Sequence, residues 1–216
     1  SSGSGKTVLM KTIVGLLEAD NGEIFYDDIL FNALNRNQKQ GIRQKMGMLF
    51  QGGALFDSLN IEENVMFPLN MFTKDSQREK KKRVNFCLDR VGLRDVNHLM
   101  PAELSGGMKK RAAIARAIAI SPTYLFADEP NSGLDPKTAI KIDSLIKELT
   151  EEYNITTIIN SHDMNSVVEI GQNVVYLHDG KVHWQGTKEE ILFTDNTELN
   201  NFVFASSMAQ RLKKSE

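Results

Sequence analysis

Two short apolar runs lie on either side of one long helical segment in the second half of the chain. Residues 124–127 are wholly apolar, and residues 155–160 form a second run that is rich in β-branched side chains. A helix is expected between them, over about residues 136–152. Strands buried on both faces have this composition, and a helix that connects two of them makes them parallel neighbours. The chain is therefore predicted to be an α/β protein with a parallel-sheet core.

Hydrophobic patterns elsewhere add further strands and helices. The expected strands are 23–26, 45–50 and a hairpin of 174–177 with 181–184, and the expected helices are 6–17, 61–69, 76–91, one starting at residue 107, 187–193 and 197–213. The helices between about residues 60 and 121 are expected to form a helical subdomain inserted into the sheet domain. We expect one domain over residues 1–216, with a C-terminal helical extension over about 196–216.

The composition excludes some functions. Hydrophobic residues make up 41% of the chain and charged residues 25%, as in an ordinary globular protein. A formal net charge of −2 gives no reason to expect nucleic acid as a partner. The single cysteine, Cys87, lies in an apolar stripe at helical spacing, which indicates a core position. No apolar run approaches the roughly 18 residues of a membrane-spanning helix, so a membrane role would require partner subunits.

A glycine-rich segment precedes the first expected helix. It consists of Ser2, Gly3, Ser4, Gly5, Lys6 and Thr7, and Val8 follows it. The glycines allow consecutive N–H groups to point at an anion, and the helix directs its positive end to the same place. Lys6 would pair with the β- and γ-phosphates of a nucleotide, and the Thr7 hydroxyl would ligate Mg²⁺. A flexible Gly/Ser linker is the alternative interpretation.

Two carboxylates follow the apolar run 124–127. A buried strand does not hold carboxylates cheaply, so Asp128 and Glu129 should emerge at its C-terminal edge, where α/β sheets bind ligands. Asp128 would hold Mg²⁺ through water, and Glu129 would polarise the attacking water as a general base. Ordinary surface acids at a strand end are the alternative.

A third cluster opens a helix rich in Ala and Arg. Ser105 resembles an N-cap, and Gly106 and Gly107 allow a backbone to approach a phosphate closely. Taken alone, this cluster is best interpreted as a plain helix cap. Together, the three clusters occur in the order found in ABC ATPases, which the chain resembles over essentially its whole length.

This resemblance implies roles for further residues and identifies the cofactors as ATP and Mg²⁺. Gln51 is similar to the glutamine that reaches Mg²⁺ and the attacking water in that family, and His162 to the histidine that contacts the γ-phosphate. The segment that ends at Asp135 is similar to the loop that touches the partner's site. Ser105, Gly106 and Gly107 are then expected to act on the nucleotide of a second copy of the chain, because one copy supplies half of the enclosure that phosphoryl transfer needs.

The resemblance also predicts the cellular setting. Residues 50–56, 60–65 and 68–69, together with Met108 and Asn131, are similar to the MlaF-type branch, which moves phospholipid between bacterial inner and outer membranes. The partners would be transmembrane permease subunits and a substrate-binding lipoprotein, with the chain bound peripherally at the cytoplasmic face of the inner membrane. An importer ATPase for a small solute such as an amino acid is an alternative, and an ABC ATPase acting on nucleic acid or ribosomes is another.

Two expectations concern the chain ends. The sequence opens inside the glycine-rich segment, so we expect an N-terminally truncated copy that lacks a strand and the aromatic residue that stacks on adenine in this family, and that therefore binds ATP weakly. Near the other end, Phe202, Phe204 and Met208 could form a dimer contact, or the segment could be a frayed tail.

Overall fold

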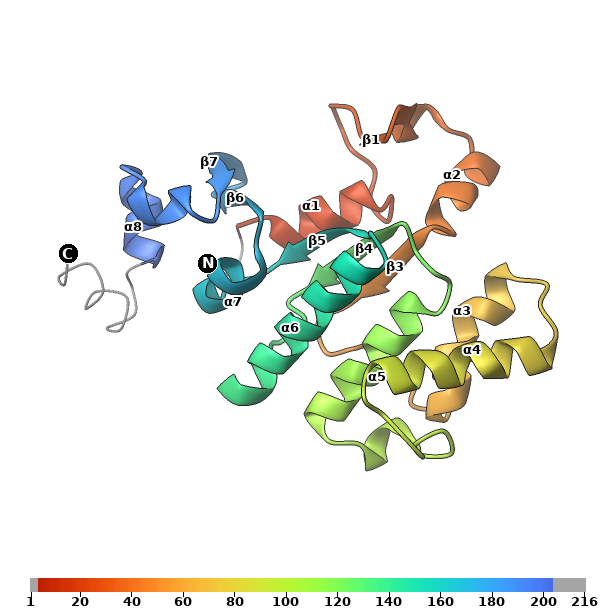
Figure 1. The fold of residues 1–216 in the computed structure, drawn as a ribbon. Helices are drawn as coiled ribbons and strands as arrows, with labels where there is room; N and C mark the ends of the chain where they lie inside the picture. Colours follow the sequence, from red (N-terminus) through yellow and green to blue (C-terminus); the bar gives the residue numbers. More distant parts are fainter. Residues whose placement is uncertain (1–3, 204–216) are drawn as a thin grey trace. The chain divides into compact units, whose positions relative to one another are not determined.

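The computed structural model of this chain describes residues 4–203, and the side chains of residues 192 and 201–203 are not described within that range (Figure 1). The described residues form two compact units, one of residues 4–9 with 161–203 and one of residues 10–160. Ser2, Gly3, Phe204 and Met208 lie outside the described residues. The two units are described separately.

A three-stranded parallel sheet forms the centre of the larger unit. Its order is β3 (Met46–Leu49), β4 (Tyr124–Asp128) and β5 (Thr156–Asn160), and α6 (Pro136–Glu152) connects β4 to β5 (Figure 1). Every residue of β4 is buried, as its apolar composition requires. The predicted α/β class and the strand–helix–strand unit are therefore confirmed.

Three helices lie between β3 and β4 along the chain, namely α3 (Ile61–Phe72), α4 (Gln77–Arg90) and α5 (Gly106–Ile118), with the short 3₁₀ helix η2 (Pro101–Glu103) before α5. Reciprocal side-chain caps begin α3 and α4, through Asn60 with Glu63 and Ser76 with Glu79. The buried residues of α5 include several alanines, and their small side chains allow neighbouring elements to approach the helix backbone closely. Residues of all three helices, of β4 and of α6 share one hydrophobic core.

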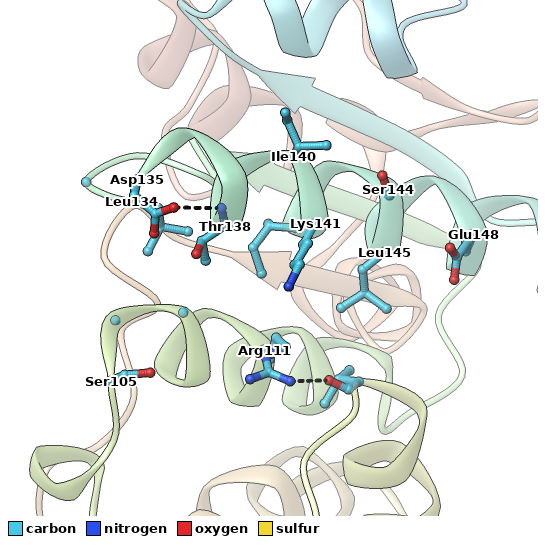
Figure 2. Close-up of a pocket in the computed structure, with 15 residues that line it drawn as sticks. Ser105, Arg111, Leu134, Asp135, Thr138, Ile140, Lys141, Ser144, Leu145 and Glu148 are labelled. Carbon is cyan, nitrogen blue, oxygen red and sulfur yellow. Dashed lines mark hydrogen bonds between the residues drawn. The ribbon is translucent and has the colours of Figure 1, made fainter.

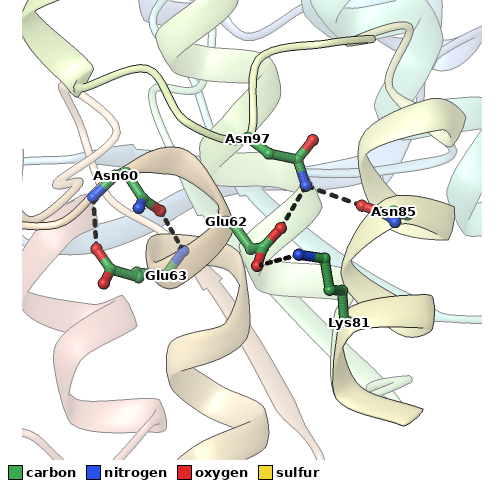
Figure 3. A network of polar contacts seen from close by, with 6 residues as sticks. All are labelled: Asn60, Glu62, Glu63, Lys81, Asn85 and Asn97. Carbon is green, nitrogen blue, oxygen red and sulfur yellow. Dashed lines mark hydrogen bonds and ion pairs between the residues drawn. The ribbon is translucent and has the colours of Figure 1, made fainter. Parts of the chain in front are cut away.

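A polar network joins the start of α3 to α4 and to the loop before η2 (Figure 3). Asn97 donates from Nδ2 to Glu62 Oε2 and to Asn85 Oδ1, each at 2.8 Å, and Lys81 lies 3.2 Å from Glu62 Oε1. The backbone N–H groups of Ile61 and Glu62 donate to carbonyls of this loop. These bonds satisfy N–H groups that the first turn of a helix otherwise leaves without partners.

The remainder of the larger unit consists of short elements around a second core cluster. They are the end of α1 (Lys6–Ile13), β1 (Phe25–Tyr26), β2 (Ile29–Leu30), the 3₁₀ helix η1 (Phe31–Ala33) and α2 (Arg36–Arg43). α1 ends four residues before the predicted Leu17, because Gly15 adopts φ +75° and the Leu16 N–H then donates to the Lys11 carbonyl. α2 was not predicted.

The smaller unit contains α7 (Met164–Ile170), β6 (Asn173–His178), β7 (Lys181–Thr187), the 3₁₀ helix η3 (Glu190–Phe193) and α8 (Thr197–Val203). β6 and β7 form the predicted antiparallel hairpin, with positive φ at both Asp179 and Gly180. The helix expected over residues 187–193 is a 3₁₀ turn, since β7 extends to Thr187. Among the helices within residues 4–203, none combines the length and apolarity that crossing a bilayer requires.

Candidate active site

Two acidic residues and one amide meet at the C-terminal edge of the parallel sheet. Asp128 is the last residue of β4 and is 7% exposed, and Asn160 is its register partner at the end of β5. Asn160 Nδ2 donates to Asp128 Oδ1 at 3.1 Å, while the Glu129 N–H donates to the Asn160 carbonyl at 2.9 Å. β5 thus orients both acidic residues. Sequence reasoning treated Asn160 only as the end of a strand.

Glu129 also contacts the first strand of the sheet through Gln51. Gln51 Nε2, two residues beyond β3, donates to Glu129 Oε2 at 3.2 Å. The Glu129 backbone has φ +47°, a left-handed conformation that is costly for a residue with a Cβ and that clusters at functional sites. The structure therefore brings together three of the predicted site residues, Gln51, Asp128 and Glu129.

The loop that follows Gln51 is fixed by a residue that sequence reasoning missed. Arg116 of α5 donates from its two terminal nitrogens to the carbonyls of Gly53 and Ala54, at 2.9 and 2.8 Å. Its guanidinium also lies over the Phe56 ring, 5.6 Å from the centroid. Burial lowers the pKa of Arg116. An arginine three turns into a helix carries no motif that would indicate this role.

The residues that open α5 line a cleft of about 800 Å³ between α5 and α6 (Figure 2). Ser105 is the N-cap of α5, and its Oγ accepts from the Met108 N–H at 3.3 Å. Gly107 is required by packing as well, because a Cβ there would lie 2.8 Å from Cγ2 of Thr138. A Cβ on Gly106 would meet Leu134 at an ordinary 3.4 Å. Close helix contact therefore explains one of the two glycines.

Asp135 lies at the same end of this cleft as Ser105 (Figure 2). It is the N-cap of α6, where its Oδ1 accepts from the Thr138 N–H at 3.1 Å, and hydrogen bonds from Thr138 lower the pKa of its carboxyl. The starts of two helices consequently face one end of the cleft. Each presents the partial positive charge that helix N-termini direct at anions.

The smaller unit holds the described part of the glycine-rich segment. Gly5 has φ +92°, and the Leu9 N–H donates to its carbonyl at 2.8 Å, which closes the first turn of α1. Ser4 is buried, and Lys6 Nζ donates to Ser4 Oγ at 3.2 Å. Thr7 and Val8 lie in the first turn of α1. The positive φ of Gly5 allows the backbone to turn directly into α1.

His162 belongs to the same unit and follows Ser161 in a tight turn. The Asp163 N–H donates to Ser161 Oγ at 3.0 Å, and Asp163 caps α7 by accepting from the Asn165 N–H at 2.9 Å. Hydrogen bonds on both sides of the histidine thus fix the backbone that carries it.

The donor atoms at the sheet edge suit a hard cation. Within residues 4–203 no group of three or more His, Cys, Asp or Glu side chains is placed to hold a metal ion. Asp128 and Gln51 offer a carboxylate and an amide oxygen instead. Mg²⁺ bound with a nucleotide usually takes one or two such ligands and completes its shell with phosphate oxygens and water, so this set fits it.

Comparison with known proteins decides the family. A sequence profile described as "ABC transporter" matches residues 1–132, which is more than half of the chain. The intermembrane phospholipid transport system ATP-binding protein MlaF of Haemophilus influenzae is 41% identical over 206 residues, covering 95% of this chain and 78% of that protein. The chain is an ABC transporter ATPase.

Solved structures agree with this assignment. This ABC ATPase superimposes on the dimeric ATP-binding cassette MJ0796, in a post-hydrolysis state bound to ADP and Pi, with a TM-score of 0.79 and 36% identity over 87% of this chain and 82% of that one. It also matches cbiO1 of Clostridium perfringens with a TM-score of 0.82 and 29% identity, over 99% and 84% of the two chains. The predicted fold, P-loop NTPase of the ABC type, and the predicted ATPase activity are confirmed.

A second group of relatives imports a small solute. The methionine import ATP-binding protein MetN 2 of Bacillus cereus is 38% identical over 203 residues, covering 94% of this ABC ATPase and 60% of that protein. The chain is the ATP-binding subunit of an ABC transporter, and its relatives include ATP-binding proteins named for phospholipid transport and for methionine import.

Proposed function

We propose that this ABC ATPase powers the movement of phospholipid between the inner and outer membranes of a bacterium. The observation that carries the proposal is its 41% identity to an MlaF protein over 95% of the chain. The segment after Gln51 and the presence of Met108 at the start of α5 are further similarities to that branch. The protein would act peripherally at the cytoplasmic face of the inner membrane, against transmembrane permease subunits, in a system that includes a substrate-binding lipoprotein.

The chemistry we propose starts from the contacts at the sheet edge. Glu129 acts as the general base that orients and polarises the attacking water. Gln51 donates to the Glu129 carboxylate and keeps that carboxylate oriented toward the water. Asp128, acting through water, and Gln51 would hold Mg²⁺, together with the Thr7 hydroxyl. Mg²⁺ would neutralise charge that develops on the β- and γ-phosphate oxygens.

The remaining residues would bind the triphosphate. Residues 2–8, with Lys6 as the cation, cradle its phosphates, and His162 contacts the γ-phosphate. Ser105, Gly106, Gly107 and Asp135 act on the nucleotide of a second copy of the chain. The two helix starts at one end of the α5–α6 cleft support this assignment, since they offer N–H groups and positive dipole ends to an anion from outside the chain.

Import of a small solute is the second candidate function. The identity of 38% to a methionine import ATPase over 94% of this chain favours it, although the chain spans 60% of that relative. Cargo is selected by the membrane and binding subunits, so an ATPase subunit carries only indirect information about it.

One experiment separates the two functions. The full-length ATPase is purified with the membrane subunits that co-purify with it, and lipid extracted from the complex is measured by mass spectrometry. Phospholipid transport predicts bound phospholipid in excess of a detergent-matched control membrane complex, and ATP hydrolysis that rises when phospholipid vesicles are added. Hydrolysis stimulated by an amino acid with its binding protein, and unaffected by phospholipid, would overturn the proposal.

A further inference from the structure

The segment between β4 and α6 carries Glu129 but has no regular secondary structure. It begins with the left-handed Glu129, whose carbonyl accepts from the Ser132 N–H at 3.1 Å. Gly133 follows with φ +75°, and Asp135 then caps α6. A strained turn of this kind persists only where surrounding contacts hold it. The side chains that hold this one come from two different helices.

The first contact comes from α5. Lys110 is 7% exposed, and its ammonium lies 3.5 Å from the Glu129 carbonyl oxygen and 3.4 Å from Ser132 Oγ. Burial lowers the pKa of Lys110, and the charge of Glu129 opposes that shift. A buried ammonium is costly without acceptors, and these two oxygens of the turn are acceptors that it reaches. Lys110 therefore links the helix that starts at Ser105 to the backbone of Glu129.

The second contact comes from α6. Asp143 is 4% exposed, and its Oδ2 accepts a hydrogen bond of 3.0 Å from Nδ2 of Asn131, which is 8% exposed. A carboxylate this deeply buried requires such donors, and breaking the contact leaves it poorly solvated. Asn131 is the second residue after Glu129. The turn is thus held from one helix through Lys110 and from the other through Asp143.

We propose that Lys110 and Asp143 are positioning residues for ATP hydrolysis, which hold the Glu129 turn between α5 and α6. The inference rests on the proposed role of Glu129 as general base. Neither side chain needs to contact the nucleotide, because each acts through residues of the turn: Lys110 through the Glu129 carbonyl and Ser132 Oγ, and Asp143 through the side chain of Asn131. Loss of either contact would let the Glu129 carboxylate drift from the attacking water, while the groups that bind the phosphates remain in place.

Steady-state ATP hydrolysis by the full-length ATPase tests the first contact. Lys110→Met should lower kcat about 10- to 100-fold with little change in KM, because misplacement of a catalytic group by about 1 Å costs rate rather than affinity. Lys110→Gln keeps an N–H donor and should recover part of the loss. Lys147→Met removes an exposed lysine of α6 and should leave kcat unchanged. Unfolding curves confirm that each variant is folded at the assay temperature.

A double-mutant cycle distinguishes positioning from general damage. In a Glu129→Gln background, adding Lys110→Met should reduce the single-turnover rate by less than twofold, since both changes act on the same step. If Lys110→Met leaves kcat unchanged, or lowers the rate by the same factor in both backgrounds, the positioning role is wrong. If Glu129→Gln itself hydrolyses ATP at the parental rate, the proposed general base is wrong instead.

An exchange of side chains tests the second contact. Asn131→Asp places two carboxylates together and should lower kcat, and so should Asp143→Asn, which removes the acceptor charge. The double variant Asn131→Asp with Asp143→Asn restores a donor facing an acceptor and should recover kcat to within about threefold of the parent. A double variant no better than the worse single one would contradict the role assigned to Asp143.

Discussion

At the scale of single residues, Glu129 is held through both its backbone and its side chain. Its backbone is left-handed, its N–H donates to Asn160, and its carboxylate accepts from Gln51. The first partner is the last residue of β5, and the second lies two residues beyond β3. They orient the carboxylate through contacts within the protein, which is the preorganisation that electrostatic and general-base catalysis require.

Replacing Glu129 with Gln should separate binding from chemistry. The amide keeps the shape of the side chain but cannot accept a proton, so kcat should fall about 10²- to 10⁴-fold, the range of general-base catalysis. ATP affinity, measured with a fluorescent nucleotide, should stay within about threefold of the parent. Lys6→Ala is the contrasting variant, because it removes a phosphate ligand and should weaken affinity itself. Parental hydrolysis by Glu129→Gln would refute the assignment.

Cys87 offers a second prediction at this scale. The thiol is fully buried in α4, and burial raises its pKa to about 11. The native protein should therefore resist a thiol reagent at pH 8, and labelling should appear only as urea unfolds the chain. The unfolded thiol ionises at lower pH, so stability should fall as pH rises from about 9 towards 11. Rapid labelling of the folded protein at pH 8 would contradict the core position.

At the scale of elements, the sequence predicted best those segments with strong local signals. α6 agrees with its expected bounds because Asp135 and Pro136 mark its start. α2 was missed because Ile42 is its one buried residue, so no apolar stripe marks it; the cap formed by Asn35 and Gln38 was the available signal. The predicted end of α1 was wrong because Gly15, with its positive φ, ends the helix inside the predicted range.

The residues of the candidate site likewise fall into those that local sequence signals predict and those that they do not. Gln51, Asp128 and Glu129 follow strands and could be predicted, since strand ends meet at one sheet edge. Lys110 and Asp143 lie inside helices, and their partners are 19 and 12 residues away along the chain. No local pattern marks such pairs, because they depend on how α5 and α6 pack. The same holds for Arg116.

The contact between α5 and α6 provides a prediction about packing. Gly107→Ala places a methyl group 2.8 Å from Cγ2 of Thr138, a stiff β-branched side chain. Overpacking strain of about 1–3 kcal/mol should outweigh a gain in helix propensity of up to about 1 kcal/mol, so urea denaturation should show net destabilisation.

Two variants serve as controls for this packing effect. Thr138→Ser removes the clashing methyl group and should restore most of the stability in the Gly107→Ala background. Gly106→Ala, whose Cβ meets Leu134 at 3.4 Å, should be nearly neutral for stability. If Gly107→Ala is as stable as the parent, close helix contact does not explain this glycine.

At the scale of the whole molecule, the cleft between α5 and α6 is the surface that we propose for binding a second copy of the chain. One end of the cleft carries the N-termini of α5 and α6. The structure of the related cassette MJ0796 is dimeric. A second copy that brings its own bound nucleotide would complete the phosphate environment at this surface.

The proposed dimer predicts a change of mass with nucleotide. Full-length Glu129→Gln should sediment as a monomer without nucleotide and as a dimer with ATP and Mg²⁺, because bound but unhydrolysed ATP bridges the two copies. Ser105→Arg, which fills the start of α5 with a long side chain, should abolish the dimer while ATP affinity stays within about threefold. Full parental turnover by a strictly monomeric full-length protein would exclude a shared site.

The geometry of α5 has a consequence for communication between two bound nucleotides. Lys110 and Arg116 stand five and eleven residues after Ser105 on one rigid helix, and they fasten the backbone near Glu129 and the loop beyond Gln51. A shift of α5 by even a fraction of an ångström at its N-terminus would displace the groups that Lys110 and Arg116 contact. If a second copy binds at the start of α5, as proposed, hydrolysis of its ATP would move α5 and thereby displace Glu129 and the loop after Gln51. This coupling between the two sites would pass through the helix and not through the sheet.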